Sequence, residues 1–242
     1  MFMEKLPLIV RKALANGVHL FTATGAVWGF LTLLAIWDGN YRLAIIYILV
    51  AMFVDGFDGI LARWLDVKKY AAWIDGGLLD NIIDYLNYVV VAALLLIRVP
   101  NLMPHGFEMV AAFSILLTSG FQFSQVEAKS DEQSYFFKGF PSVWNFLVIY
   151  MMLLGLNPWI NFALLVICNF LIFVPIKYLY PTRNTRMRRL TLLLTYLYSA
   201  VGVWGLLQYP DVPGWVTPVS FIYVAYYAAM SFFPKLGSAR SA

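Results

Sequence analysis

Residues 41–65 read YRLAIIYILVAMFVDGFDGILARWL, an apolar run long enough to cross a membrane that nevertheless carries Asp55 and Asp58. The next apolar run, residues 72–97, reads AWIDGGLLDNIIDYLNYVVVAALLLI and carries Asp80 and Asp84. A helix of about 20 apolar residues matches a hydrocarbon core of ~30 Å. The two runs therefore predict a pair of membrane helices that place acidic side chains inside the apolar layer.

The composition of the whole chain is typical of a protein that lies in a lipid bilayer. Of its 242 residues, 62% are hydrophobic and 12% are charged, whereas soluble domains carry about 25% charged residues. We therefore expect an all-α integral membrane protein, folded as a single membrane domain over residues 1–242 and in contact with membrane lipids. The net charge of +4 is small and unevenly placed, so it indicates membrane topology and lipid headgroups rather than nucleic-acid binding.

Apolar runs separated by turn residues predict about eight transmembrane helices. Lys and Arg gather in the cytoplasmic segments of membrane proteins. If both termini lie in the cytoplasm, 15 of the 17 Lys and Arg residues fall in cytoplasmic segments, and only Arg42 and Arg98 do not. We therefore place both termini in the cytoplasm. A short amphipathic helix at residues 1–16 is predicted to lie on the cytoplasmic leaflet. The fifth span is short and could pair with the sixth in a tight hairpin. The expected spans are residues 18–37, 41–65, 72–97, 106–126, 142–156, 158–179, 189–208 and 214–234.

The four aspartates of the second and third spans are predicted to face one another. Asp55 and Asp58 are three residues apart, and a three-residue spacing keeps both on one helix face. Asp80 and Asp84 are four apart, which does the same. Both pairs lie ~12–20 Å from the turn near residues 66–71, at the helical rise per residue. The sequence thus brings four carboxylates to one depth.

Buried carboxylates need a counter-charge. Each unpaired Asp at mid-span costs ~2.5–3.5 kcal/mol, and hard divalent cations with all-oxygen coordination would offset that cost. Mg²⁺, Mn²⁺ and Ca²⁺ all suit such carboxylate sites. We expect two ions, Mn²⁺ or Mg²⁺, which together would form a site for phosphate oxygens. The alternative is a structural polar cluster, or carboxyl groups that stay protonated.

The pattern D-x-x-D-G-x-x-A-R, followed by G-x-x-x-D-x-x-x-D, resembles the signature of the CDP-alcohol phosphotransferase family. The gap at residues 64–75 is longer than in most of that family. This gap, the eight spans and the segments 18–25 and 136–145 resemble the bacterial branch that uses choline as the acceptor. The signature positions are filled by Asp55, Asp58, Gly59, Ala62, Arg63, Gly76, Asp80 and Asp84.

The resemblance implies an enzyme of the bacterial inner membrane, with its active site facing the cytoplasm. It would transfer the phosphatidyl group of CDP-diacylglycerol to choline and release CMP. A six-helix core at residues 18–179 would be followed by two additional helices at residues 189–234, and the enzyme would be a homodimer.

The resemblance also implies a role for each signature residue. Asp55, Asp58 and Asp80 would ligate the metals, while Asp84 would ligate a metal and act as the general base. Arg63 would hold a phosphate. A packing role for His19 is as consistent with the sequence as a ligand role. The residues implied at the nucleotide and the CDP-lipid are Gly59, Ala62, Arg63 and Gly76, with His19, Thr22 and Thr24 as candidates from the first span.

The acceptor is the least constrained part of this hypothesis. The quaternary ammonium of choline cannot donate a hydrogen bond and is usually held by aromatic faces. The aromatic side chains predict a choline cage from Tyr88, Trp144 and Glu127, with Tyr85 as a further candidate, although an interfacial aromatic belt would explain the same rings. Serine, inositol phosphate and glycerol phosphate are alternative acceptors. A cation transporter is an alternative from another class, but the acidic element is not repeated in the second half of the chain.

Overall fold

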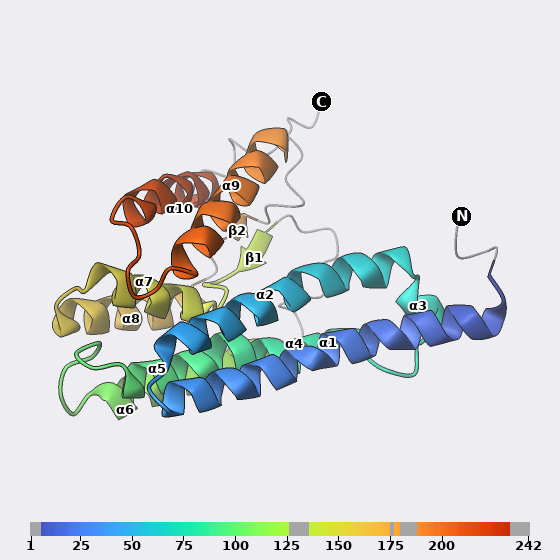
Figure 1. Cartoon of the computed structure of the whole chain (residues 1–242), viewed down its shortest axis with the longest axis horizontal. Coiled ribbons are helices and arrows are strands. Elements are labelled where there is room, and N and C mark those ends of the chain that lie inside the picture. Colours follow the sequence, from blue (N-terminus) through green and yellow to red (C-terminus); the bar gives the residue numbers. More distant parts are fainter. Residues whose placement is uncertain (1–5, 126–135, 175–176, 180–187, 233–242) are drawn as a thin grey trace.

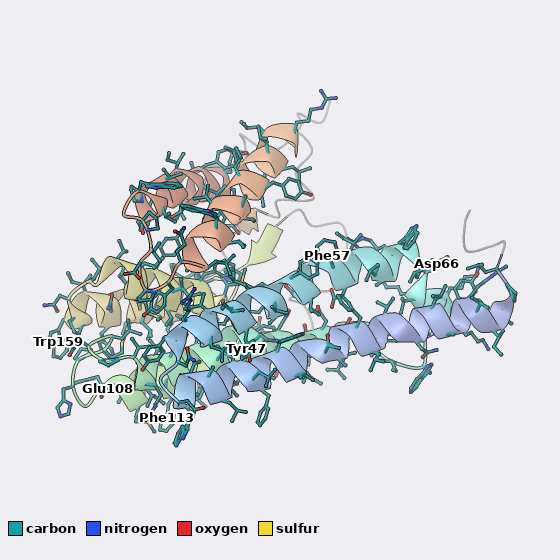
Figure 2. All side chains as sticks on the ribbon, viewed as in Figure 1. Tyr47, Phe57, Asp66, Glu108, Phe113 and Trp159 are labelled. Carbon is teal, nitrogen blue, oxygen red and sulfur yellow. The ribbon has the colours of Figure 1, made fainter. Side chains whose placement is uncertain are left out.

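The computed structural model describes residues 6–125, 136–174, 177–179 and 188–232, and nearly all of these are helical. Helices α1 (Leu8–Trp37) and α2 (Tyr41–Trp64) form a long antiparallel hairpin (Figure 1). The later helices gather around the end at which α1 turns into α2, while the other end projects and carries the short helix α3 (Val67–Tyr70). Asp66 lies at this projecting end (Figure 2). The prediction of a helical membrane protein is confirmed, apart from one short pair of strands among the described residues.

One uninterrupted helix of 30 residues makes up α1, so the separate interfacial helix predicted at residues 1–16 is wrong for the part from residue 8 onward. Residues 1–5 lie outside the described part of the chain. The reason is packing, because Ala15 and Val18 are buried against Leu65 and Ala71 of the projecting end. These contacts hold the first turns of α1 in line with the rest of the helix.

The third predicted span is one helical segment with a π-helical turn in its middle. It consists of α4 (Gly76–Asp84), the π-helix η2 (Tyr85–Val90) and α5 (Val91–Arg98). Asp75 caps the start of α4, since its Oδ1 accepts hydrogen bonds of 3.0 Å from two backbone N–H groups of the first turn. The π turn follows directly after Asp84.

The second half of the described chain contains further helices and one short pair of strands. The strands are β1 (Phe136–Lys138) and β2 (Lys177–Leu179), which pair antiparallel. They were not predicted, and the sixth span, expected to run to residue 179, ends as a helix at Phe173. The helices are α6 (Glu108–Phe123), α7 (Trp144–Leu154), α8 (Pro158–Phe173), α9 (Arg188–Leu206) and α10 (Val216–Phe232).

Four helical segments among the described residues are long and apolar enough to cross a membrane, namely 8–37, 41–64, 76–98 and 189–206. Four shorter apolar helices occupy the positions of the remaining predicted spans. Large apolar side chains point outward on several of them, and Leu117 and Phe170, for example, are 75% and 76% exposed. Such surface suits lipid as the surrounding solvent.

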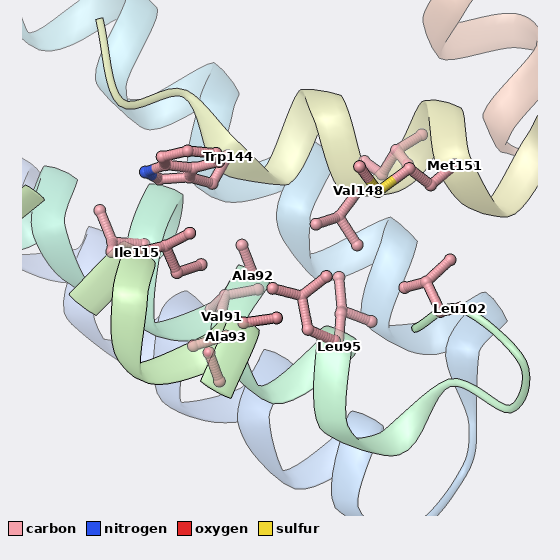
Figure 3. Packing of buried hydrophobic residues seen from close by; sticks show 14 of the residues in the cluster. Val91, Ala92, Ala93, Leu95, Leu102, Ile115, Trp144, Val148 and Met151 are labelled. Atoms are coloured by element: carbon pink, nitrogen blue, oxygen red, sulfur yellow. The ribbon is translucent and has the colours of Figure 1, made fainter. Parts of the chain in front are cut away.

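A buried apolar core joins the third span to α6 and α7 (Figure 3). Leu95 of α5 and Ile115 of α6 pack there with Trp144 of α7, and none of the three has more than 1% of its surface exposed. The indole Nε1 of Trp144 donates a hydrogen bond of 2.7 Å to the Ser119 hydroxyl. The third span is therefore anchored on the side that faces α6 and α7.

We predict that Trp144→Ala destabilises the protein, because it leaves a cavity in this core. Removing a buried Trp costs about 3–5 kcal/mol, which corresponds to a fall in Tm on the order of 10 °C for a chain of this size. Thermal unfolding in detergent measures the change. Trp159→Ala, at a side chain that is 58% exposed, is the control and should lower Tm much less.

Candidate active site

Three of the four predicted acidic residues meet between α2 and α4. Asp55, Asp80 and Asp84 each present a carboxylate oxygen, and these oxygens lie within 4.8 Å of one another. All three side chains are half-buried. The i,i+4 spacing on α4 and the antiparallel course of α2 produce this convergence.

The fourth acidic residue, Asp58, lines the same pocket but is not one of the three that meet within this distance. Its side chain is only 8% exposed. Thr22 of α1 hydrogen-bonds to the Asp58 side chain. The structure therefore gives Thr22, a residue predicted to contact the nucleotide, a direct partner in the acidic pocket.

A narrow pocket with a cavity volume of about 10 Å³ connects these groups. This is close to the space that one water-sized particle needs. None of the residues that line it is basic, so the charge of its carboxylates suits small hard cations with oxygen ligands. The donor set fits divalent metal ions, whereas a nucleotide or an acyl chain must lie outside this space. The lining residues are Thr22, Gly25, Ala51, Val54, Asp55, Asp58, Asp80, Ile83, Asp84, Asn87 and Tyr88.

The first helix forms one wall of the pocket and approaches the third span closely. Asn87 is 8% exposed, and its Nδ2 donates hydrogen bonds of 3.1 Å to the backbone carbonyls of Gly25 and Ile83. A Cβ atom on Gly25 would lie 2.7 Å from Cγ2 of Ile83. Only glycine allows this approach. Asn87 and Gly25 were not predicted as site residues, because neither belongs to the acidic signature.

The signature residues on α2 lie toward the projecting end of the hairpin. Arg63 is exposed, and a Cβ atom on Gly59 would lie 3.4 Å from a terminal nitrogen of its guanidinium group. Ala62 is half-buried beside it. A cationic group with solvent access next to a helix face without bulky side chains is suited to contact a phosphate.

His19 has a packing role in the structure. Its side chain is 6% exposed, and its Nε2 lies 3.3 Å from the carbonyl oxygen of Ala71. A Cβ atom on Gly76 would come within 3.1 Å of the His19 ring. His19 and Gly76 thus hold α1 against the start of α4, which favours packing over the predicted nucleotide contact. The Thr24 hydroxyl bonds to the Phe21 carbonyl of its own helix.

The described members of the predicted choline cage do not meet around one space in this structure. Trp144 is fully buried in the core, so its ring cannot receive a ligand in this conformation. Tyr85 donates a hydrogen bond of 2.9 Å to the Leu116 carbonyl on α6, and Glu127 lies outside the described residues. Of the cage residues that the structure describes, only Tyr88 lines the acidic pocket, where its hydroxyl donates to Oδ2 of Asp55 at 2.8 Å.

Fold and pocket together define a helical membrane protein whose carboxylate site suits divalent metal ions and the phosphate groups that such ions bind. Residues 12–175 match the CDP-alcohol phosphatidyltransferase family, and the chain belongs to this family. The resemblance seen in the acidic signature is therefore confirmed. Because the chain belongs to a family of transferases, the carboxylate cluster is better explained as an enzyme site than as a cation transport site.

Curated relatives extend the match over most of the chain. The phosphatidylcholine synthase of Legionella pneumophila is 36% identical over 222 residues, which cover 89% of this chain and 86% of the relative. That of Mesorhizobium japonicum is 38% identical over 197 residues, or 81% of this chain and 72% of the relative. That of Agrobacterium fabrum is 33% identical over 229 residues, or 93% of each.

We predict that Gly25→Ala reduces activity about tenfold, because the new methyl group pushes α1 away from Ile83 and disturbs the pocket wall. The measurement is CMP release by purified protein, together with Tm in detergent. Gly17→Ala is the matched control on the same helix, since a Cβ atom there meets nothing within 4 Å. It should preserve activity and stabilise α1 by up to about 1 kcal/mol. Equal activity of the two variants would contradict the role of the close contact.

Proposed function

We propose that this chain is a phosphatidylcholine synthase, which transfers the phosphatidyl group of CDP-diacylglycerol to choline and releases CMP. The observation that carries this proposal is the convergence of Asp55, Asp80 and Asp84 in a membrane helix pair. It is supported by the family match and by relatives named phosphatidylcholine synthase that cover most of the chain.

The acidic residues would hold two divalent metal ions, Mn²⁺ or Mg²⁺, between α2 and α4. Asp55, Asp80 and Asp84 have the mutual distances for this role, and Asp58 supplies a fourth carboxylate in the same pocket. When bound, such ions offset the negative charge of the pyrophosphate and of the leaving CMP.

The side chains of the protein would perform the remaining steps. Asp84 accepts the proton of the choline hydroxyl, whose oxygen forms the new bond to the phosphorus atom that bears diacylglycerol. The bond from this phosphorus to the bridging oxygen breaks, and CMP leaves with that oxygen. Arg63 holds a phosphate oxygen outside the narrow pocket, and the small residues Gly59 and Ala62 leave room for the cytidine beside it.

The same proposal includes the arrangement in the membrane. Eight helices would cross the inner membrane of a bacterium, with both termini and the active site on the cytoplasmic side, and the enzyme would act as a homodimer. The 11 residues of α7 span only ~17 Å, so the non-helical residues 139–143 before α7 would complete this crossing. Both backbone groups of Phe140 in this segment are paired within the protein, since its N–H donates to the Leu171 carbonyl and its carbonyl accepts from Gln122.

The test is an assay of purified protein in lipid nanodiscs with CDP-diacylglycerol and choline. We predict CMP and phosphatidylcholine in equal amounts when Mn²⁺ or Mg²⁺ is present, and none after EDTA treatment, with recovery when metal is restored. Parallel reactions contain serine, inositol phosphate or glycerol phosphate in place of choline. Faster CMP release with one of these acceptors would overturn the choline assignment but leave the family chemistry intact.

We predict that Asp84→Asn lowers kcat at least 100-fold, because an amide cannot accept the hydroxyl proton and general bases contribute about 10²–10⁴-fold. Steady-state CMP release at saturating choline and metal measures the effect. Asp66→Asn makes the same chemical change at the projecting end, where φ is +53° and Asn is well tolerated. This control should stay within about twofold of the unchanged protein. Activity of Asp84→Asn above a tenth of normal would contradict the general-base role.

A further inference from the structure

A single π-helical turn connects the acidic part of the third span to three other helices. Tyr85 bonds to the Leu116 carbonyl of α6, and Asn87 bonds to the Gly25 carbonyl of α1. Tyr88 bonds to the Asp55 carboxylate of α2. The turn begins at the residue after Asp84, and π-helical turns inside α-helices occur frequently at functional sites.

Of these three hydrogen bonds, only the one from Tyr88 ends on a carboxylate of the acidic cluster, that of Asp55. Tyr88 Oη donates to Oδ2 of Asp55 at 2.8 Å. The Tyr88 ring stacks on Phe146 of α7, with a centroid distance of 6.5 Å and an interplanar angle of 10°. The ring is thus fixed on one side by α7, and its hydroxyl reaches across to α2.

We propose that Tyr88 is a positioning residue, which orients the Asp55 carboxylate for metal binding. The inference rests on the proposed metal site. A carboxylate on a single Cβ rotates freely unless a partner fixes it, and hydrogen-bond donors next to metal ligands commonly provide this orientation. The phenol is suited to this task because it donates a hydrogen bond to the carboxylate without adding positive charge that would compete with a cation. Tyr88 lies within the π turn, which spans Tyr85–Val90.

The decisive experiment compares Tyr88→Phe with Tyr85→Phe. Each removes one phenol oxygen from the same turn, but only the first loses a partner in the acidic cluster. We measure Mn²⁺ binding without substrate, by the loss of the free-ion electron paramagnetic resonance signal, using full-length protein in nanodiscs. Tyr88→Phe should raise the Kd for Mn²⁺ about tenfold, the lower end of the effect of such outer partners. Tyr85→Phe should keep Kd within twofold.

A double-mutant cycle with Asp55→Asn tests whether Tyr88 acts through Asp55. In the Asp55→Asn background, Tyr88→Phe should add less than a twofold further loss of Mn²⁺ affinity. The KM for choline should stay within twofold in Tyr88→Phe while the Mn²⁺ concentration for half-maximal activity rises. An unchanged Kd for Mn²⁺ in Tyr88→Phe would overturn the inference. An unchanged Kd together with an increase in the KM for choline would also assign Tyr88 to the choline site.

Failure of the function proposal looks different from failure of this inference. If the unchanged protein binds no Mn²⁺ and releases no CMP with choline, the proposed enzyme and metal site are wrong. If the unchanged protein does both and Tyr88→Phe binds Mn²⁺ normally, only the positioning role is wrong.

Discussion

Electrostatic repulsion among carboxylates in an apolar surrounding is the constraint on which the rest of the structure depends. Two like charges a few ångströms apart repel strongly where water is scarce, and Asp55, Asp80 and Asp84 meet within 4.8 Å. Helices that are fixed from several sides can keep these carboxylates together, and the proposed cations would offset their charge. The apolar core around Trp144 fixes the third span from one side, and α1 fixes it from another. This rigidity would hold the carboxylates in place before an ion arrives, which would favour binding.

Helix α1 carries none of the clustered acids, yet it contacts every part that does. Thr22 bonds to Asp58 on α2, Asn87 of the π turn bonds to the Gly25 carbonyl, and His19 reaches the Ala71 carbonyl just before α4. These contacts lie about one helical turn apart along a single face. The first helix therefore acts as a template against which the acidic hairpin is assembled, and its small residues let the other helices come close enough for this.

The fold and the site could be predicted from the sequence where a regular residue spacing fixes the geometry. They could not be predicted where a contact depends on tertiary packing. The i,i+3 and i,i+4 aspartates gave the acidic pocket and the helix pair that bears it, because helical periodicity decides which residues share a face. Trp144 and Tyr85 were chosen for their aromatic character, but Trp144 is buried in the core, the Tyr85 hydroxyl bonds to α6, and neither residue lines the acidic pocket. The π turn, the strand pair and the continuous α1 leave no periodic signal, since each results from contacts between segments distant in the sequence.

The length of α1 has a consequence at the membrane surface. Its 30 residues rise ~45 Å, about half as much again as a hydrocarbon core of ~30 Å. In a helix that crosses upright, the surplus turns would lie among the lipid headgroups, together with the segment that packs on them. Arg11 and Lys12 on α1 and Lys68 and Lys69 on α3 give this region a positive collar, in which each cation near an anionic surface contributes about 1 kcal/mol of attraction. Such a collar would attract anionic lipids, and a lipid that bears a diphosphate would be among them.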